Sequence, residues 1–556
     1  MGGGSKTESR GADGLSVRER AANLDRMGRE AFDIAVIGGG ITGAGIALDA
    51  ASRGMSAALI DKGDFAGGTS SRSSKLIHGG LRYLQQFEFS LVREALRERA
   101  ALRQSAPHLS RPLAFLAPVY SAGERSPLGG SKLKLGAGLW LYDLLAGGKN
   151  IARHRWLTRR EATRLAPALE SKNLRGGFVY YDCLTDDARL VIEVIKAASR
   201  RGAVVANYAR ASGFIRAGGR AAGVLVEDRL SSREVELRAK VIVNATGVWS
   251  DEVSRLADAT APDRLRPSKG IHVVMPSEKF NSGAAVLIPS LGERRFLFVI
   301  PWQGRTVIGT TDTDYTGDLD DPRAEEEEIR RVVESAARYF PGAGVSTEDV
   351  ISAYAGLRPL VGGADKSTKE LSRREEIIES EPGLISIIGG KLTTYRRMAE
   401  RAVDLVERRL GRGKSKGRTD ATGMTLAGGL LLPQGAGEEA ERAAAEFGVT
   451  TATARHLIDT YGGNYKMLLE MTRESEDLKH ALIRGLPHIE AEVVYAARYE
   501  MAVTLDDFLA RRTRLALLAR DGGHSCATRV ASLMAGELGW SKAEAQKAMA
   551  ELPARV

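Results

Sequence analysis

A glycine-rich turn between two apolar runs constrains the fold of this chain more than any other feature. The turn has the spacing G-x-G-x-x-G, with Gly38, Gly40 and Gly43 at the three fixed positions. An apolar run typical of a buried strand, residues 33–37, precedes the turn, and a stretch of small residues suited to a helix, 44–52, follows it. Glycine at these positions lets backbone N–H groups and the start of a helix approach a pyrophosphate group.

A second strand and an acidic residue complete this unit. Residues 57–60 are apolar, and Asp61 follows them. The acid stands about twenty residues after the glycines, where a carboxylate accepts a hydrogen bond from a ribose hydroxyl. The succession of strand, turn, helix, strand and acid predicts a Rossmann-like α/β fold that binds a dinucleotide.

Later segments indicate that this dinucleotide is FAD rather than NAD. Residues 202–205 read as a strand, and we expect Val204 to lie beside the adenine. A further strand, starting at residue 241, leads into a turn of small residues that contains Ala245 and Gly247, and then into a helix start.

A third strand, residues 384–388, runs into a glycine turn and a basic helix. The start of such a helix can face an anionic ring edge. The cofactor domain is therefore expected to be discontinuous in the sequence. The residues expected at this last turn are Gly389, Gly390, Lys391, Leu392 and Thr393.

Strand-like runs between these segments predict an antiparallel sheet that serves as a substrate cap, and helical composition after the glycine-rich tract at 411 predicts an α-helical carboxyl-terminal domain. The expected ranges are a disordered tail, 1–14; an FAD-binding domain within 15–410, approximately 31–110, 185–265 and 350–410; a cap, approximately 111–184 and 266–349; a linker, 411–424; and a helical domain, 425–556.

Composition and charge restrict the class of function. The net charge is +10, but the basic residues are spread along the chain without aromatic residues between them, so no nucleic-acid partner is expected. Two isolated cysteines, Cys183 and Cys526, fit a reducing cytoplasm, and with eight scattered histidines they offer no metal-ligand spacing. We expect no metal and no transmembrane helix, so that any membrane contact is peripheral.

The stretch from Gly67 to Leu84, GGTSSRSSKLIHGGLRYL, closely resembles the signature of FAD-dependent glycerol-3-phosphate dehydrogenases. The resemblance continues in four shorter motifs and in the helical part, and it covers nearly the whole chain after residue 15. The motifs are K-G-I-H at 269–272, I-G-T-T-D at 308–312, Y-A-G-L-R-P at 354–359 and G-G-K-L-T-T-Y at 389–395.

The resemblance implies the fold of the D-amino-acid oxidase superfamily and the oxidation of sn-glycerol 3-phosphate to dihydroxyacetone phosphate by hydride transfer to noncovalently bound FAD. It further implies a membrane quinone as the electron acceptor and a peripheral position on the cytoplasmic face of the membrane. The oligomeric state stays open, with a homodimer as one alternative. Thr69, Ser70, Ser71 and His78 join the expected cofactor-binding residues.

Cations for the substrate phosphate come from the matched motifs. Most arginines in a chain with 80 basic residues are solvated surface charges, so only motif context selects candidates. Arginine offers a planar fork to phosphate oxygens and lysine a point charge. The candidates for substrate binding are Arg82, Tyr83, Arg358, Arg373 and Lys391, with Arg358 and Lys391 also expected at the reacting atoms.

Alcohol oxidation requires a base for the hydroxyl proton, and histidine is the natural choice near neutral pH. His78 and His272 are the two candidates, His78 against the flavin and His272 against the substrate. The sequence does not decide between them.

Several alternatives remain at this stage. The chain could be a glycerol-phosphate oxidase that uses oxygen, an amino-acid or sarcosine oxidase, or a flavin-binding protein without turnover. Membrane contact could come from residues 131–160, where basic residues flank an apolar run, or from the basic helical tail. For residues 131–160 we favour the simpler interpretation, in which the apolar side chains pack inside the protein.

Overall fold

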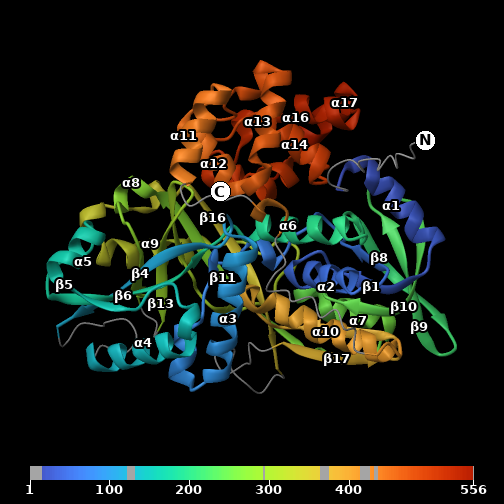
Figure 1. Ribbon diagram of the computed structural model, residues 1–556, viewed down its shortest axis with the longest axis horizontal. Coiled ribbons are helices and arrows are strands. Elements are labelled where there is room, and N and C mark those ends of the chain that lie inside the picture. The colour runs from blue at the N-terminus through green and yellow to red at the C-terminus, as the bar shows by residue number, and fades with distance from the viewer. Residues whose placement is uncertain are drawn as a thin grey trace, which may run out of the picture.

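The computed structural model describes residues 15–121, 132–291, 295–362, 375–413, 426–430 and 436–554. Two lobes built on β-sheets lie side by side, and a lobe of helices lies across one end of both (Figure 1). The predicted tail, Arg373 and most of the predicted linker lie outside the described residues.

The first lobe holds a sheet whose central strands are parallel. Its strand order is β17 (Glu376–Glu381), β18 (Leu384–Ile388), β10 (Glu234–Asn244), β1 (Phe32–Ile37), β2 (Ala57–Ile60) and β7 (Val204–Ala206). The strands β1, β10 and β18 come from distant parts of the sequence and pair in parallel. This pairing confirms the predicted Rossmann-like α/β fold. A hairpin of β8 (Ala209–Ala217) and β9 (Arg220–Asp228) extends β10, and α1 (Val17–Arg29) and α7 (Ser250–Ala257) contact this lobe.

The helix after the glycine turn, α2 (Ile41–Ser52), packs between α6 (Asp187–Arg200) and α10 (Tyr395–Arg409). Nine of its twelve residues are buried, which explains why its sequence consists mainly of small apolar residues and has no wide polar face. The largest cluster of buried apolar side chains lies here, between these three helices and the first sheet.

The second lobe holds a larger, mainly antiparallel sheet. Its order is β15 (Thr313–Asp314), β11 (Leu265–Pro276), β14 (Arg305–Gly309), β13 (Phe296–Trp302), β12 (Ala285–Pro289), β4 (Arg111–Tyr120), β6 (Leu174–Leu184) and β3 (Leu76–Ile77), with β16 (Ser352–Val361) beside β11 and β5 (Arg155–Thr158) beside β6. One internal pair, β4 with β12, is parallel. The helices of this lobe include α3 (Phe89–Ser105), α4 (Lys132–Ala146), α5 (Arg159–Leu165), α8 (Ser277–Phe280) and α9 (Glu326–Tyr339).

Two strands connect the lobes. The strands β3 and β16 pair into the second sheet, although they belong to the ranges 31–110 and 350–410 that we predicted for the cofactor domain. Each is continuous with a segment that lies against the first lobe. The predicted domain boundaries stay predictions, but this sharing places the junction of the lobes beside the segments 69–78 and 352–361.

The third lobe consists of helices. They are α11 (Ala436–Phe447), α12 (Thr451–Tyr461), α13 (Tyr465–Glu474), α14 (Ala491–Tyr499), α15 (Leu515–Leu518), α16 (His524–Leu538) and α17 (Lys542–Ala550), with a wider helical turn over Asp507–Arg512. This turn faces the first lobe.

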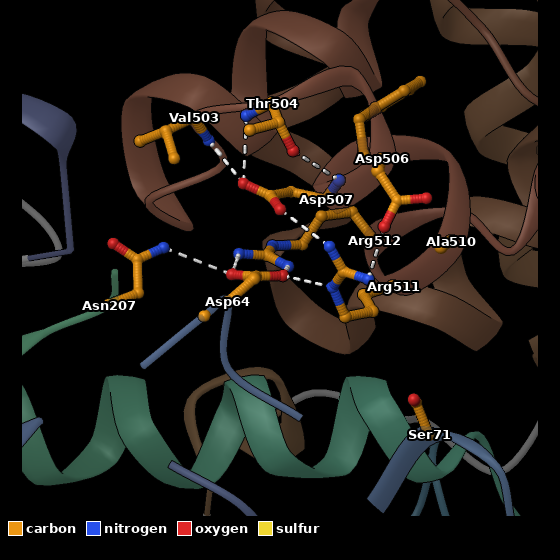
Figure 2. A network of polar contacts seen from close by, with 12 residues as sticks. Asp64, Ser71, Asn207, Val503, Thr504, Asp506, Asp507, Ala510, Arg511 and Arg512 are labelled. Atoms are coloured by element: carbon orange, nitrogen blue, oxygen red, sulfur yellow. Dashed lines mark hydrogen bonds and ion pairs between the residues drawn. The ribbon is translucent and has the colours of Figure 1, made fainter. Parts of the chain in front are cut away.

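Buried ion pairs join the helical lobe to the loop that follows β2 (Figure 2). The Asp64 carboxylate accepts hydrogen bonds from Arg512 Nη1 at 2.7 Å and Nη2 at 2.9 Å, and it also pairs with Arg511. Asn207 donates to Asp64 and to the Met501 carbonyl, one partner in each lobe. Because a buried charge without a partner is costly, these contacts fix the helical lobe against the loop that follows β2.

The glycine turn gives a test of this packing. A Cβ added at Gly43 would lie 1.8 Å from the Gly38 carbonyl oxygen, whereas one added at Gly138, within α4, would meet nothing within 4 Å. We expect Gly43→Ala to lower the free energy of unfolding by at least about 1–3 kcal/mol, since backbone must move. Gly138→Ala is the control, and it should be neutral or stabilising by about 0.5–1 kcal/mol. Urea unfolding measures both, and equal stabilities would contradict the packing described.

Candidate active site

A cavity of about 270 Å³ lies where the two sheet lobes meet. Its walls come from the signature segment, from the strands β11 and β16, and from the turn η8 (Leu392–Thr394) before α10. Eight of the residues that we predicted for the site line this one cavity. They are Thr69, His78, Tyr83, His272, Arg358, Lys391, Leu392 and Thr393.

The glycine fingerprint forms the adjoining end of the first lobe. Asp61 Oδ2 accepts a hydrogen bond from Gly39 N at 2.6 Å, and Oδ1 accepts one from Gly63 N at 2.9 Å. Burial raises the pKa of Asp61 to about 6, partly offset by these two hydrogen bonds. The acid therefore stands at the end of β2, beside the glycine turn, where the motif requires it.

The start of α2 fits an anionic group. Gly40 is the residue before the helix, and it has no side chain with which to cap the helix start. Ser70 Oγ reaches the same point and accepts from Ile41 N at 3.0 Å. Gly38 has a φ of +108°, and a Cβ there would lie 2.7 Å from the Ala245 carbonyl oxygen. Free helix N–H groups and close backbone approach are what a pyrophosphate needs.

The other predicted cofactor residues lie around the same sheet edge. Val204 is in β7, next to β2, and Ala245 and Gly247 follow β10. Gly389 and Gly390 follow β18 with φ of +77° and +86°, in the left-handed region that favours glycine. Ser71 ends the short turn η1 (Thr69–Ser71).

His272 presents a neutral imidazole to the cavity. Its Nε2 is hydrogen-bonded to Ser74 Oγ at 2.8 Å, and its ring stacks on Tyr354 with centroids 4.8 Å apart. Burial, followed by the charges of Lys75 and Arg358, lowers the pKa of His272 well below its ordinary value. Within the part of the chain that the structure describes, its Nδ1 has no hydrogen-bond partner. A neutral ring of this kind can accept a proton.

His78 also lines the cavity, at the end of β3 and beside the turn η8. Its backbone N donates to Thr393 Oγ1 at 3.2 Å, which ties the end of β3 to η8. Lys391, directly before that turn, holds its Nζ 3.7 Å from the centre of the Tyr83 ring. Lys391 and Tyr83 are thus in contact, and both line the cavity together with His78.

Two guanidinium groups share one carboxylate at the polar end of the cavity. Arg358 donates Nη1 to Asp312 Oδ1 at 3.2 Å and Nη2 to Thr310 Oγ1 at 2.8 Å. Arg295 forms an ion pair with the other oxygen of Asp312. Both guanidinium groups line the cavity, and guanidinium groups suit an anionic ligand.

Sequence reasoning missed several of these neighbours. Ser74 and Asp312 stand inside matched motifs, so their position was a usable signal, but neither residue type suggests a site by itself. Arg295 lies in none of the matched motifs. It reaches the cavity because it stands directly before β13, a strand that lines the cavity. For Arg82 the structure places the backbone in the turn η2 (Leu81–Gln86) and does not describe the side chain.

One group of metal-ligand type exists in the described residues: His456, His488 and Glu492 in the helical lobe. Glu492 Oε1 accepts from His456 Nε2 at 2.8 Å and from Tyr461 at 2.9 Å, while His488 Nε2 lies 3.0 Å from the Thr513 carbonyl oxygen. These contacts describe a buried hydrogen-bond network, and the expectation of no metal stays a prediction.

The apolar run within residues 131–160 divides between core and surface. Leu139 and Tyr142 of α4 are buried, whereas Leu133, Trp140 and Leu144 are 82%, 62% and 59% exposed. The interpretation in which the apolar run packs inside the protein is therefore wrong for Trp140 and Leu144. Across the described residues, no helix combines the length and apolar character that crossing a membrane requires.

Comparison with known families agrees with this geometry. The family described as "FAD dependent oxidoreductase" matches residues 33–396, and the family "C-terminal domain of alpha-glycerophosphate oxidase" matches residues 420–545. Fold and site therefore define an FAD-dependent oxidoreductase, as the resemblance implied.

Similar proteins narrow the class. The glycerol-3-phosphate dehydrogenase of Mycobacterium leprae is 39% identical and covers 98% of this chain and 91% of its own length. The aerobic glycerol-3-phosphate dehydrogenase of Bacillus subtilis is 40% identical over 90% of each chain. The crystal structure of the glycerol-3-phosphate dehydrogenase from Bacillus halodurans complexed with FAD is 34% identical, covers 97% of each chain and has a TM-score of 0.79. The chain thus belongs to the glycerol-3-phosphate dehydrogenase family. This is the family whose signature the stretch from Gly67 to Leu84 resembles.

The shared carboxylate at the polar end predicts a large loss of stability when it is removed. Asp312→Ala leaves Arg295 and Arg358 without their common anion, and we expect the free energy of unfolding to fall by about 3 kcal/mol. The matched control is Asp320→Ala, which breaks the exposed pair with Lys62 and should cost less than about 1 kcal/mol. Chemical denaturation of both variants measures the difference, and similar losses would argue against a buried, shared counter-ion.

Proposed function

We propose that the protein oxidises sn-glycerol 3-phosphate to dihydroxyacetone phosphate with noncovalently bound FAD, and passes the electrons to a membrane quinone. The observation that carries the proposal is one cavity that combines a neutral histidine with the cations Arg358 and Lys391, next to the glycine fingerprint. The names of the similar proteins agree with this substrate.

The phosphate is bound at the cationic walls. Arg358 offers its planar fork, Lys391 a point charge and Tyr83 a hydroxyl, and Arg295 joins them through Asp312. Arg82 and Arg373 are further proposed phosphate contacts, and only their place in the sequence motifs supports them. Several charge-assisted contacts hold the dianion and leave the carbinol end of the substrate directed toward the flavin.

His272 removes the hydroxyl proton. Its low pKa keeps the imidazole neutral near pH 7, and the Ser74 hydroxyl holds the ring in place. FAD, when bound, accepts the hydride. His78 lies against the flavin at the turn that carries Lys391 and Thr393, and it positions the cofactor rather than taking the proton.

The fingerprint and its neighbours bind the cofactor. The start of α2, with Gly38, Gly40 and Gly43, receives the pyrophosphate, and Asp61 receives a ribose hydroxyl. The remaining proposed contacts are Thr69, Ser70, Ser71, Val204, Ala245, Gly247, Gly389, Gly390, Leu392 and Thr393.

An exposed apolar surface supports a peripheral position on the cytoplasmic face of an anionic membrane. Phe87 directly follows η2 and is 79% exposed, and Phe89 begins α3 and is 40% exposed. The elements α3, α4 and η2 pack together. The helices α3 and α4, of which α4 carries the exposed Trp140 and Leu144, lie on the edge of the molecule away from the carboxyl-terminal helices (Figure 1). The turn η2 also lines the cavity through Leu81 and Tyr83, so a quinone in this membrane would approach the flavin side.

Anaerobic mixing with glycerol 3-phosphate tests the reaction. The flavin absorbance should bleach, and the rate should stay constant at lower pH until well below 6.5, because His272 loses function only when protonated.

Arg358→Ala and Lys391→Ala should each lower kcat/KM roughly ten- to hundredfold, for a lost contact of about 1.5–3 kcal/mol, with FAD retained. Arg238→Ala, at an exposed pair on β10, is the control. Unchanged kinetics in both site variants would move the phosphate site elsewhere.

Reoxidation and vesicle binding test the acceptor and the location. Reduced enzyme should react much faster with a quinone analogue than with oxygen, and it should sediment with anionic vesicles at low salt but less at high salt, because salt screens charge attraction. Trp140→Ser with Leu144→Ser should weaken sedimentation, whereas Leu225→Ser, exposed on β9, should not. Rapid reaction with oxygen and stoichiometric peroxide, without vesicle binding at any salt, would identify an oxidase instead.

A further inference from the structure

We propose that Lys75, Asp187 and Arg514 form a positioning unit through which the helical lobe sets the orientation of His272 in the active site. The inference rests on the proposed function, because it gives His272 the role of the base. None of the three residues lines the cavity, so each acts through others.

The unit consists of one buried carboxylate between two buried cations. Lys75 Nζ lies 2.9 Å from both Asp187 oxygens, and Arg514 forms an ion pair with Asp187 from the helical lobe. The side chains of Lys75 and Asp187 are 0% exposed and that of Arg514 is 2% exposed. Both cations also donate to the Ser71 carbonyl oxygen, at 2.6 Å and 3.3 Å.

Asp187 holds the segment that contacts His272. Its Oδ2 accepts from Ser73 N at 2.9 Å and from Ser73 Oγ at 2.7 Å. The next residue, Ser74, provides the hydroxyl on His272 Nε2. Tyr354, on which the imidazole stacks, donates its hydroxyl to the Ser73 carbonyl oxygen at 2.8 Å. The hydrogen bond and the stacking surface of His272 therefore both depend on the backbone that Asp187 anchors.

The backbone at the two cations is unusual. Lys75 has a φ of +60° and Arg514 a φ of +65°, in the left-handed region where glycine is favoured. A glycine would remove this backbone strain but would also remove the cation. Both positions carry a long charged side chain despite this strain, and its contacts to Asp187 and Ser71 offset the conformational cost.

The charges around His272 give the unit a measurable signature. Burial is the first cause of the lowered pKa of His272; Lys75 and Arg358 lower it further, and Asp187 raises it. Tyr354 packs on the ring face as a neutral group. Replacing Lys75 by a neutral residue removes one of the two cations, so the pKa of His272 should rise and the acidic limb of the rate profile should move to higher pH.

A second ion-pair group between the same lobes serves as a matched control. Asp64 pairs with Arg511 and Arg512, which are buried in the same helical turn region (Figure 2). These three residues lie outside the set that lines the cavity. In Arg512→Met, Asp64 keeps Arg511, just as in Arg514→Met Asp187 keeps Lys75, so each carboxylate keeps one cation. Each variant also removes a second contact, that of Arg514 with Asp186 or that of Arg512 with the Glu500 carbonyl oxygen.

The test compares these variants in the FAD-loaded enzyme. Arg514→Met should slow flavin reduction by saturating glycerol 3-phosphate at least tenfold, with KM and bound FAD changed less than twofold, and Arg514→Lys should restore part of the rate. Arg512→Met should lose similar thermal stability but keep its rate within twofold. In Lys75→Met, NMR of histidine-labelled enzyme should show a raised pKa for His272, whose signal among the eight histidines is assigned with His272→Gln.

Equal slowing in Arg514→Met and Arg512→Met would overturn the proposal, as would an unchanged pKa of His272 in Lys75→Met. If Lys75→Met does not fold, the contrast between the two arginine variants decides. If glycerol 3-phosphate fails to bleach the wild-type flavin, the proposed function falls. The NMR comparison of His272 then still tests the positioning unit, because it needs no turnover.

Discussion

Burial of charge in compensated groups holds the three lobes around one cavity. Asp64 faces two arginines of the helical lobe, Asp187 faces Lys75 and Arg514, and Arg189 faces Glu500. An intact buried pair adds little net stability, but removing one partner costs about 3–5 kcal/mol. These ion-pair groups therefore add little stability themselves, but they restrict how the lobes can be positioned relative to one another. A shift of the lobes that breaks one of these ion pairs would leave an unpaired charge in an apolar interior.

Charged groups with nearby partners also determine the properties of the cavity. Its polar end holds two guanidinium groups against one carboxylate, and its reactive wall holds an imidazole kept neutral by burial and nearby cations. A dianionic substrate would add negative charge beside these guanidinium groups, which favours binding without protonating the base. The arrangement separates two tasks, attraction of a phosphate and acceptance of a proton, that a single set of cationic residues could not perform together.

Local patterns in the sequence predicted the elements that carry backbone contacts. The glycine spacing, the strand at 384–388 and the glycines after it follow from steric rules over short stretches, and the structure has them where the patterns indicated. The resemblance selected His272, Arg358 and Lys391, and the structure brings them into one cavity. Lys75, Ser74 and Arg295 were missed because their surroundings are made by distant segments. The exposure of Trp140 was also missed, since an amphipathic stretch does not say how much of its apolar face the protein covers.

The position of the arginines in the chain has a consequence for assembly. Asp64 lies in the first lobe, and Arg512 follows it by 448 residues. During synthesis the first lobe is complete long before the segment that neutralises its buried carboxylate leaves the ribosome. Until then, the loop after the second strand carries an unmatched charge that must stay in water. The loop that follows β2 therefore reaches its final conformation only when the last helices dock, which makes docking of the helical lobe a late event of biogenesis.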